Sequence, residues 1–145
     1  MKKILFLLAM ILTLCGCQEA DTGYTDDLTK AQAISVTAAG TSEVLQTITG
    51  EDSITAFVSA LEMETWTYQS LPDDVQPIGS FTLSQNKTIL FGQTSADPAL
   101  YDIAVITLYS NACIRLTTGG LDLSFSVRPD TAEYLQKSDR SHVVL

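Results

Sequence analysis

Histidine is nearly absent from this sequence, and so are the motifs that hold metal ions or phosphate groups. The one histidine among 145 residues is His142, close to the end of the sequence. A Ser-His-Asp triad or a histidine-rich metal site in an ordered pocket is therefore excluded. No acidic loop of the EF-hand type and no glycine-rich phosphate loop is present either. The sequence thus predicts no catalytic residue, no metal site and no cofactor.

Basic residues and long apolar runs are also scarce. Eight lysines and arginines stand against 17 aspartates and glutamates, which gives a net charge of −9. An acidic surface repels the phosphates of nucleic acids, so nucleic acid is excluded as a partner. The one long apolar run extends from Ile4 to Leu14, and its 11 residues fall short of the roughly 20 that cross a bilayer as a helix. A membrane-spanning segment is therefore not expected.

This apolar run has the layout of an export signal. It follows Lys2 and Lys3 and ends in small residues just before Cys17. A positive start, an apolar middle and a small-residue end are typical of a secretory signal peptide. The alternative, a buried first helix of a cytosolic domain, is disfavoured because the run has no polar face.

The residues Leu14-Cys15-Gly16-Cys17 resemble the lipobox of bacterial lipoproteins, in which an aliphatic residue stands three positions before a cysteine. The resemblance implies that the thiol of Cys17 receives a diacylglyceryl group and that the signal peptide, residues 1–16, is removed. Two acyl chains attach a protein stably to a membrane. We therefore expect a lipid-anchored protein on the extracytoplasmic face of the cell membrane.

The mature chain is expected to have two parts. Residues 17–32 are polar and poor in aliphatic side chains, which predicts a lipidated N-terminus and a flexible tether. Residues 33–145 are long enough for a single domain with its own core. Cys113 is the only cysteine of that domain, so it cannot form an intramolecular disulfide. Its strand-like surroundings favour a packed side chain over a reactive thiol.

Alternation of apolar and polar residues predicts that strands dominate the domain. Such runs occur at residues 34–38, 43–48, 65–68, 80–84, 88–93, 101–111, 112–118 and 121–127. The run 101–111 is apolar on both sides, so we expect a central strand that is covered on both faces.

Helices are predicted at two places. The first is indicated by apolar residues at helical spacing, namely Ile54, Phe57, Val58 and Leu61, and the second by a proline-started stretch at residues 129–137. The predicted fold class is α+β, an antiparallel sheet of hairpins with an early helix and a short C-terminal helix packed on one face. This plan resembles that of small uncharacterised lipoproteins of Gram-positive bacteria.

Trp66 and Tyr68 are the candidate binding residues, because they share one face of a predicted strand. Two aromatic rings so placed can form a platform for a sugar ring, and the alternative is that they pack in the core. We expect a non-catalytic binding module of the cell envelope whose partner is a protein, a peptide or a glycan. The alternative is a glycan-cleaving hydrolase that uses only carboxylates, with Asp73, Asp74, Asp97 and Asp102 as candidates. The lack of a catalytic constellation favours the binding module over the enzyme.

Overall fold

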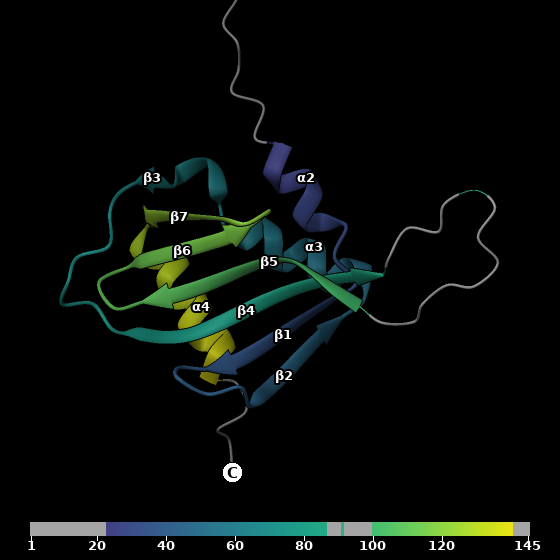
Figure 1. Cartoon of the computed structure of the whole chain (residues 1–145), viewed down its shortest axis with the longest axis horizontal. Helices are drawn as coiled ribbons and strands as arrows, with labels where there is room; N and C mark the ends of the chain where they lie inside the picture. Colours follow the sequence, from purple (N-terminus) through teal and green to yellow (C-terminus); the bar gives the residue numbers. More distant parts are fainter. Residues whose placement is uncertain (1–22, 87–90, 92–99, 141–145) are drawn as a thin grey trace, which may run out of the picture.

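The computed structural model describes residues 23–86, 91 and 100–140 of the chain (Figure 1). In this part, seven strands form one sheet in the order β2-β1-β4-β5-β6-β7-β3, and every neighbouring pair is antiparallel. The strands are β1 (Ala33–Ala38), β2 (Val44–Thr49), β3 (Thr67–Tyr68), β4 (Pro77–Asn86), β5 (Leu100–Tyr109), β6 (Cys113–Thr118) and β7 (Leu121–Ser126). The helices are α2 (Gly23–Thr29), α3 (Glu51–Ala60) and α4 (Pro129–Arg140), and a short 3₁₀ helix, η2 (Met63–Thr65), precedes β3.

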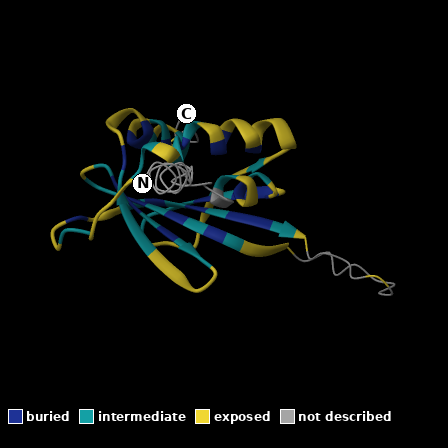
Figure 2. Ribbon diagram, turned by 90° about the horizontal axis from the view of Figure 1, so that it is seen from above, coloured by how far each residue is buried: buried dark blue, intermediate teal, exposed yellow. Residues whose placement is uncertain are grey.

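All three α-helices lie on the same face of the sheet (Figure 2). We call this the helix-covered face and the other the open face. The predicted α+β class is confirmed, since an early helix, α3, and a C-terminal helix, α4, both pack on one side of an antiparallel sheet. Within the described residues, no helix has the length and apolar character needed to span a membrane.

The core lies between the helices and the helix-covered face. Every second residue of the four central strands enters it, and most of these side chains are fully buried: Ile34, Val36, Phe81, Leu83, Ala104, Ile106, Leu108, Ile114 and Leu116. The predicted helix around Phe57 is α3, and Phe57 packs its ring on Phe81 with the ring centroids 5.3 Å apart. Leu61, which follows α3, is also fully buried, as its position in the helical spacing predicts.

Helix α4 crosses the sheet at close range because β4 has a glycine below it. A Cβ atom on Gly79 would lie 2.6 Å from Oδ1 of Asp139, a separation that no real Cβ atom shows. Leu135 of the same helix is fully buried, and the ring of Tyr134 lies 6.0 Å from that of Phe57. The absence of a side chain at Gly79 thus sets how closely the C-terminal helix approaches the sheet.

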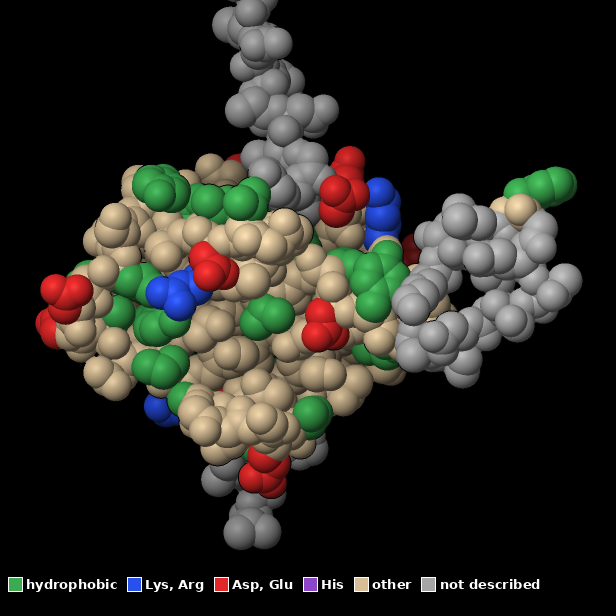
Figure 3. Space-filling view, in the orientation of Figure 1, with side chains coloured by type: hydrophobic (Ala, Val, Ile, Leu, Met, Phe, Trp, Pro, Cys, Tyr) green, Lys and Arg blue, Asp and Glu red, His purple; other side chains and the backbone are tan. Residues whose placement is uncertain are grey.

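The open face carries few charged side chains (Figure 3), and serine and threonine are frequent on it. The strand registers align two rows of side chains across it, Thr47-Ser35-Thr82-Val105-Thr117-Asp122 and Thr37-Ser80-Thr107-Arg115-Ser124. We expected the strand at 101–111 to be covered on both faces, but described helices cover only one. Val105 and Thr107, on the open side of β5, are half-buried by neighbouring strands alone. Apolar character on both sides of a strand is therefore a weak sign of a second layer.

Two further features differ from the expectation. The flexible tether predicted for residues 17–32 is structured from Gly23 onward, where helix α2 places Leu28 in the core and Ala31 beside it. The short helix is held by tertiary packing rather than by its polar sequence. Strand β4 continues through Asn86, where a hairpin turn was predicted. The strand predicted at 88–93 falls outside the described residues except for Phe91, which is exposed.

Candidate functional site

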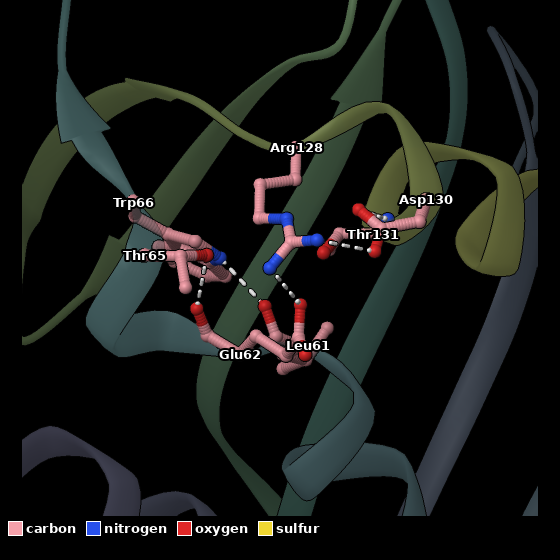
Figure 4. Close-up of polar contacts among 7 residues, drawn as sticks. All are labelled: Leu61, Glu62, Thr65, Trp66, Arg128, Asp130 and Thr131. Carbon is pink, nitrogen blue, oxygen red and sulfur yellow. Dashed lines mark hydrogen bonds and ion pairs between the residues drawn. The ribbon is translucent and has the colours of Figure 1, made fainter.

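Trp66 follows η2, and two contacts of its indole ring fix its position. Its Nε1–H donates a hydrogen bond of 2.8 Å to the carbonyl oxygen of Leu61 (Figure 4). The ring is partly buried against the core and lies 5.4 Å from the ring of Phe125. Trp66 is therefore mainly a packing residue, and its one polar group already has a partner.

Tyr68 is placed quite differently. It ends the two-residue strand β3, and its side chain is 71 % exposed. Its register partner across β7 is Phe125, and the two rings meet edge to face with their centroids 6.0 Å apart. The predicted pair Trp66 and Tyr68 is thus joined by Phe125, which lies between them, and only Tyr68 offers much of its ring to solvent. The alternation of Phe125 within the run 121–127 predicts burial, but Phe125 is only half-buried.

The other apolar residues of β7 extend this aromatic group along the edge of the sheet. Leu121, Leu123 and Phe125 all point to the helix-covered side, and Leu121 is 59 % exposed while Leu123 is half-buried. We call Tyr68, Leu121, Leu123 and Phe125 the apolar strip. Their alternation is visible in the sequence, but it predicts burial, and only the structure shows that the helices stop short of β7 and leave the strip partly open.

A cavity of about 410 Å³ adjoins the end of the strip. Leu116 and Thr118, which line it, are the register partners of Leu123 and Leu121. The remaining lining residues come from α2, from the segment after it, and from β4 and β5: Asp27, Leu28, Lys30, Gln85 and Ile103. The cavity volume lies within the range of small-ligand sites, roughly 300–1,000 Å³. No pattern in the sequence indicates this cavity, because the polar residues that form α2 have the composition of a tether.

The rim of the cavity carries an ion pair within α2 and the residue that follows it. Nζ of Lys30 lies 2.7 Å from Oδ1 of Asp27, and both side chains are more than half exposed. The hydrogen bond from Lys30 to Asp27, with the charge attraction between them, raises the pKa of the lysine above its usual value. The site therefore combines three apolar lining residues, Leu28, Ile103 and Leu116, with a solvent-exposed ion pair at its edge.

A second polar group fixes the segment that carries Trp66. Arg128, at the start of α4, reaches Oδ2 of Asp130 at 3.0 Å and Oε2 of Glu62 at 3.8 Å (Figure 4). Glu62 has a positive φ of 45°, and its carbonyl oxygen accepts a bond of 2.7 Å from the hydroxyl of Thr65. Because these ion pairs are solvent-exposed, they orient the chain between α3 and β3 more than they stabilise it.

Three of the four carboxylates proposed for a hydrolase, Asp73, Asp74 and Asp102, lie within the described residues. Asp73 and Asp74 are exposed in the turn before β4. Strand β4 pairs with β5 so that Pro77, at the start of β4, lies opposite Tyr109. Asp102, seven residues from Tyr109 along β5, is thus about 23 Å from that end of the hairpin. It accepts a hydrogen bond of 2.8 Å from Oγ of Ser84. Paired hydrolytic carboxylates lie roughly 5–9.5 Å apart, so Asp102 does not form such a pair with Asp73 or Asp74.

The remaining predicted residues can be placed briefly. Asp97 and Cys17 lie outside the described residues. Cys113 is a buried free cysteine on β6, and its thiol donates to the carbonyl oxygen of Asn111 at 3.6 Å. Within the described ranges, no group of three or more His, Cys, Asp or Glu side chains is arranged to hold a metal ion.

Comparisons of this chain with protein-family models, with curated protein sequences and with solved structures gave no match.

Proposed function

We propose that this protein is a membrane-anchored extracytoplasmic lipoprotein whose domain is a non-catalytic binding module of the cell envelope. The observation that carries the proposal is the apolar strip, in which Tyr68 and Leu121 are more than half exposed and whose Leu121 end adjoins a cavity. Exposed aromatic and aliphatic side chains next to a concave site supply most of the binding energy in protein interfaces, whereas solvated charges supply little.

The strip is well supported for this role. The ring of Tyr68 contacts the ring of Phe125 edge to face, and Phe125 in turn contacts the fixed ring of Trp66. A side chain that is already held in one position loses little conformational freedom when a partner covers it. A protein, a peptide or an envelope glycan that lies along β7 would therefore gain apolar contact at low entropic cost.

The anchor proposed at Cys17 would hold this surface near the membrane. Five residues, 18–22, separate Cys17 from the first residue of α2. Even a fully extended linker of this length reaches only about 20 Å. The module is therefore suited to partners within or just above the membrane surface, at shorter range than a tether of 17–32 would allow.

Tyr68→Ala is the variant that tests the binding surface. We expect it to weaken binding to purified cell-wall glycan or to envelope membranes about tenfold or more, as for other exposed anchors. Co-sedimentation of the soluble mature domain with each preparation measures this. Leu100→Ser is the matched control, because Leu100 is 46 % exposed but lies outside the strip.

The outcomes of this experiment are distinct. Equal co-sedimentation of wild type, Tyr68→Ala and Leu100→Ser would contradict a binding role for the strip. Hydrolysis of the glycan that disappears in Asp102→Asn would instead support the carboxylate-dependent enzyme. A lowered urea midpoint for Tyr68→Ala would show that Tyr68 has a structural role.

The anchor is tested separately with Cys17→Ser. A serine hydroxyl does not replace the thiolate in acyl transfer, so this variant should lose both lipid attachment and signal cleavage. Metabolic labelling with a fatty-acid analogue measures the first and electrophoretic mobility the second. Equal label on wild type and variant would show that Cys17 is not the lipidated residue.

A further inference from the structure

Strand β2 forms one edge of the sheet and has no partner on its outer side among the described residues. Its sequence, Val44-Leu45-Gln46-Thr47-Ile48-Thr49, contains no charge and no proline. Natural edge strands usually carry charged residues or proline, because the unpaired backbone groups of an edge can pair with strands of other chains. The opposite edge follows that rule, since β3 covers part of β7 and Asp122 stands on the uncovered part.

The backbone groups that β2 leaves free can be identified from the ladder. The N–H of Ala39 bonds the carbonyl oxygen of Ile78 in register with the β1–β4 pairs, so odd-numbered residues of β1 bond β4 and even-numbered ones bond β2. The register of β1 with β2 then turns the backbone groups of Gln46 and Ile48 inward. Those of Thr47 and Thr49 point away from the sheet.

Carboxylates stand at both ends of this uncharged strand. Glu43 precedes it, and Glu51 and Asp52 follow it after one glycine. All three are exposed, and none has an ion-pair partner within the described residues. The free edge is therefore a row of unpaired donors and acceptors bounded by negative charge at each end.

We propose that the outer edge of β2 binds an extended segment of a partner protein as an added antiparallel strand, with a β-branched, uncharged centre and basic residues at both ends. Only another polypeptide backbone satisfies alternating N–H and C=O groups along a sheet edge. Basic residues on either side of the segment would meet Glu43 at one end and Glu51 and Asp52 at the other.

Charge distinguishes this partner from a second copy of the chain. Two β2 strands related by a two-fold axis at Thr47 would bring the Glu43 end of one copy to the Glu51 end of the other. The like charges gathered at both ends would repel one another. A second copy of the chain is therefore the poorer occupant of this edge, although it would supply a strand that is uncharged like β2.

Thr47→Pro tests the proposal in the full mature chain. Proline removes an N–H that points outward, and prolines are tolerated on the outer side of edge strands, so the β1–β2 ladder should persist. The probe is a fluorescent ten-residue synthetic peptide of alternating threonine and valine with two lysines at each end. We expect Thr47→Pro to weaken its binding about tenfold or more, as measured by fluorescence anisotropy.

Three controls isolate the backbone and charge contributions. Thr47→Val keeps the N–H and should bind the peptide as wild type does. Glu43→Gln combined with Glu51→Gln should weaken binding several-fold and lower its salt dependence. Tyr68→Ala, on the other edge, should leave this binding unchanged, which separates the present proposal from the function proposed for the apolar strip.

Several results would overturn the proposal. Binding that Thr47→Pro leaves intact would show that the peptide does not add to β2. Equal affinity for the same peptide with glutamates in place of lysines would exclude the charge pattern. Dimerisation of the free chain in sedimentation, abolished by Thr47→Pro, would identify a second copy as the occupant. If Thr47→Pro fails to fold, a peptide N-methylated at alternate residues on its bonding side decides the question, since undiminished binding of that peptide excludes strand addition.

Discussion

The two faces of the same sheet have different roles, although they are built from alternate residues of the same strands. In β4, Phe81 and Leu83 are fully buried beneath the helices, whereas Ser80 and Thr82 on the open face are half-buried by their neighbours. Ser80 shares a hydrogen bond of 3.3 Å with Thr107 across the strands. One face thus supplies the apolar burial that stabilises the fold, while the other satisfies its polar groups locally and needs no cover.

The edges of the sheet also differ from its faces. The open face is neutral and hydroxyl-lined, which keeps it solvated without strong attraction for a partner. Features that call for a partner lie instead at the two edges, with the apolar strip beside β7 and the uncharged backbone of β2. In this molecule, the faces account for stability and the edges for the proposed binding.

The largest predicted effect tests the two faces at neighbouring residues. Phe81→Ala should lower the free energy of unfolding by about 3–5 kcal/mol, because it opens a cavity beneath Phe57. Thr82→Ala, one residue on but on the open face, should change it by less than about 0.5 kcal/mol. Urea unfolding of the domain measures both. Similar losses for the two variants would mean that the open face is also covered.

A smaller effect is expected at the margin of the covered face. Phe125 is only half-buried, so Phe125→Ala should cost about 2 kcal/mol, roughly half of the loss for a core phenylalanine. The same variant removes the support of Tyr68 and should weaken partner binding along the strip. A loss as large as that of Phe81→Ala in parallel urea titrations would place Phe125 in the core and close the strip.

The packing of α4 on the covered face gives a still smaller effect. In Gly79→Ala the new methyl group must displace the Asp139 carboxyl group, which we expect to cost about 1 kcal/mol, the low end for overpacking. Adding Asp139→Ala should recover most of that loss in a double-mutant cycle. Additive losses would show that Gly79 and Asp139 do not touch in solution.

Much of the covered face could be predicted from the sequence, because burial imposes a period of two on strands and a helical spacing on α3. Phe57, Leu61 and the strands of the first hairpin lie where those patterns put them. The patterns fail where tertiary packing decides. Leu28 sits in a polar stretch that would not form a helix alone, and Phe125 alternates as a core residue does although no helix fully covers it.

The candidate site was predictable only in part, for the same reason. Trp66 and Tyr68 are visible as the aromatic pair of one segment, but their different exposure follows from their surroundings, since the indole of Trp66 bonds the carbonyl of Leu61 while Tyr68 ends the edge strand β3. The cavity is lined jointly by residues of α2, β4, β5 and β6, elements far apart in the sequence. No local pattern encodes such an assembly.

The smallest predicted effect concerns Asp139, a carboxyl group that packs against the covered face. Its Oδ1 is buried and has no hydrogen-bond partner among the described residues, and this burial raises its pKa above the usual 3.8, while Arg140 opposes the shift. Because the folded state then holds the proton more tightly than the unfolded state, the ionised group costs stability at neutral pH, and that cost disappears as the pH falls below 3.8. Asp139→Asn should therefore raise the urea midpoint at pH 7 and leave it nearly unchanged at pH 3. Asp130→Asn is the matched control, because Asp130 is exposed and paired with Arg128, and it should show no gain at pH 7. A midpoint for Asp139→Asn that falls at pH 7 would mean that the charged carboxylate has a stabilising partner at this position, and that the covered face accommodates charge as readily as the open one.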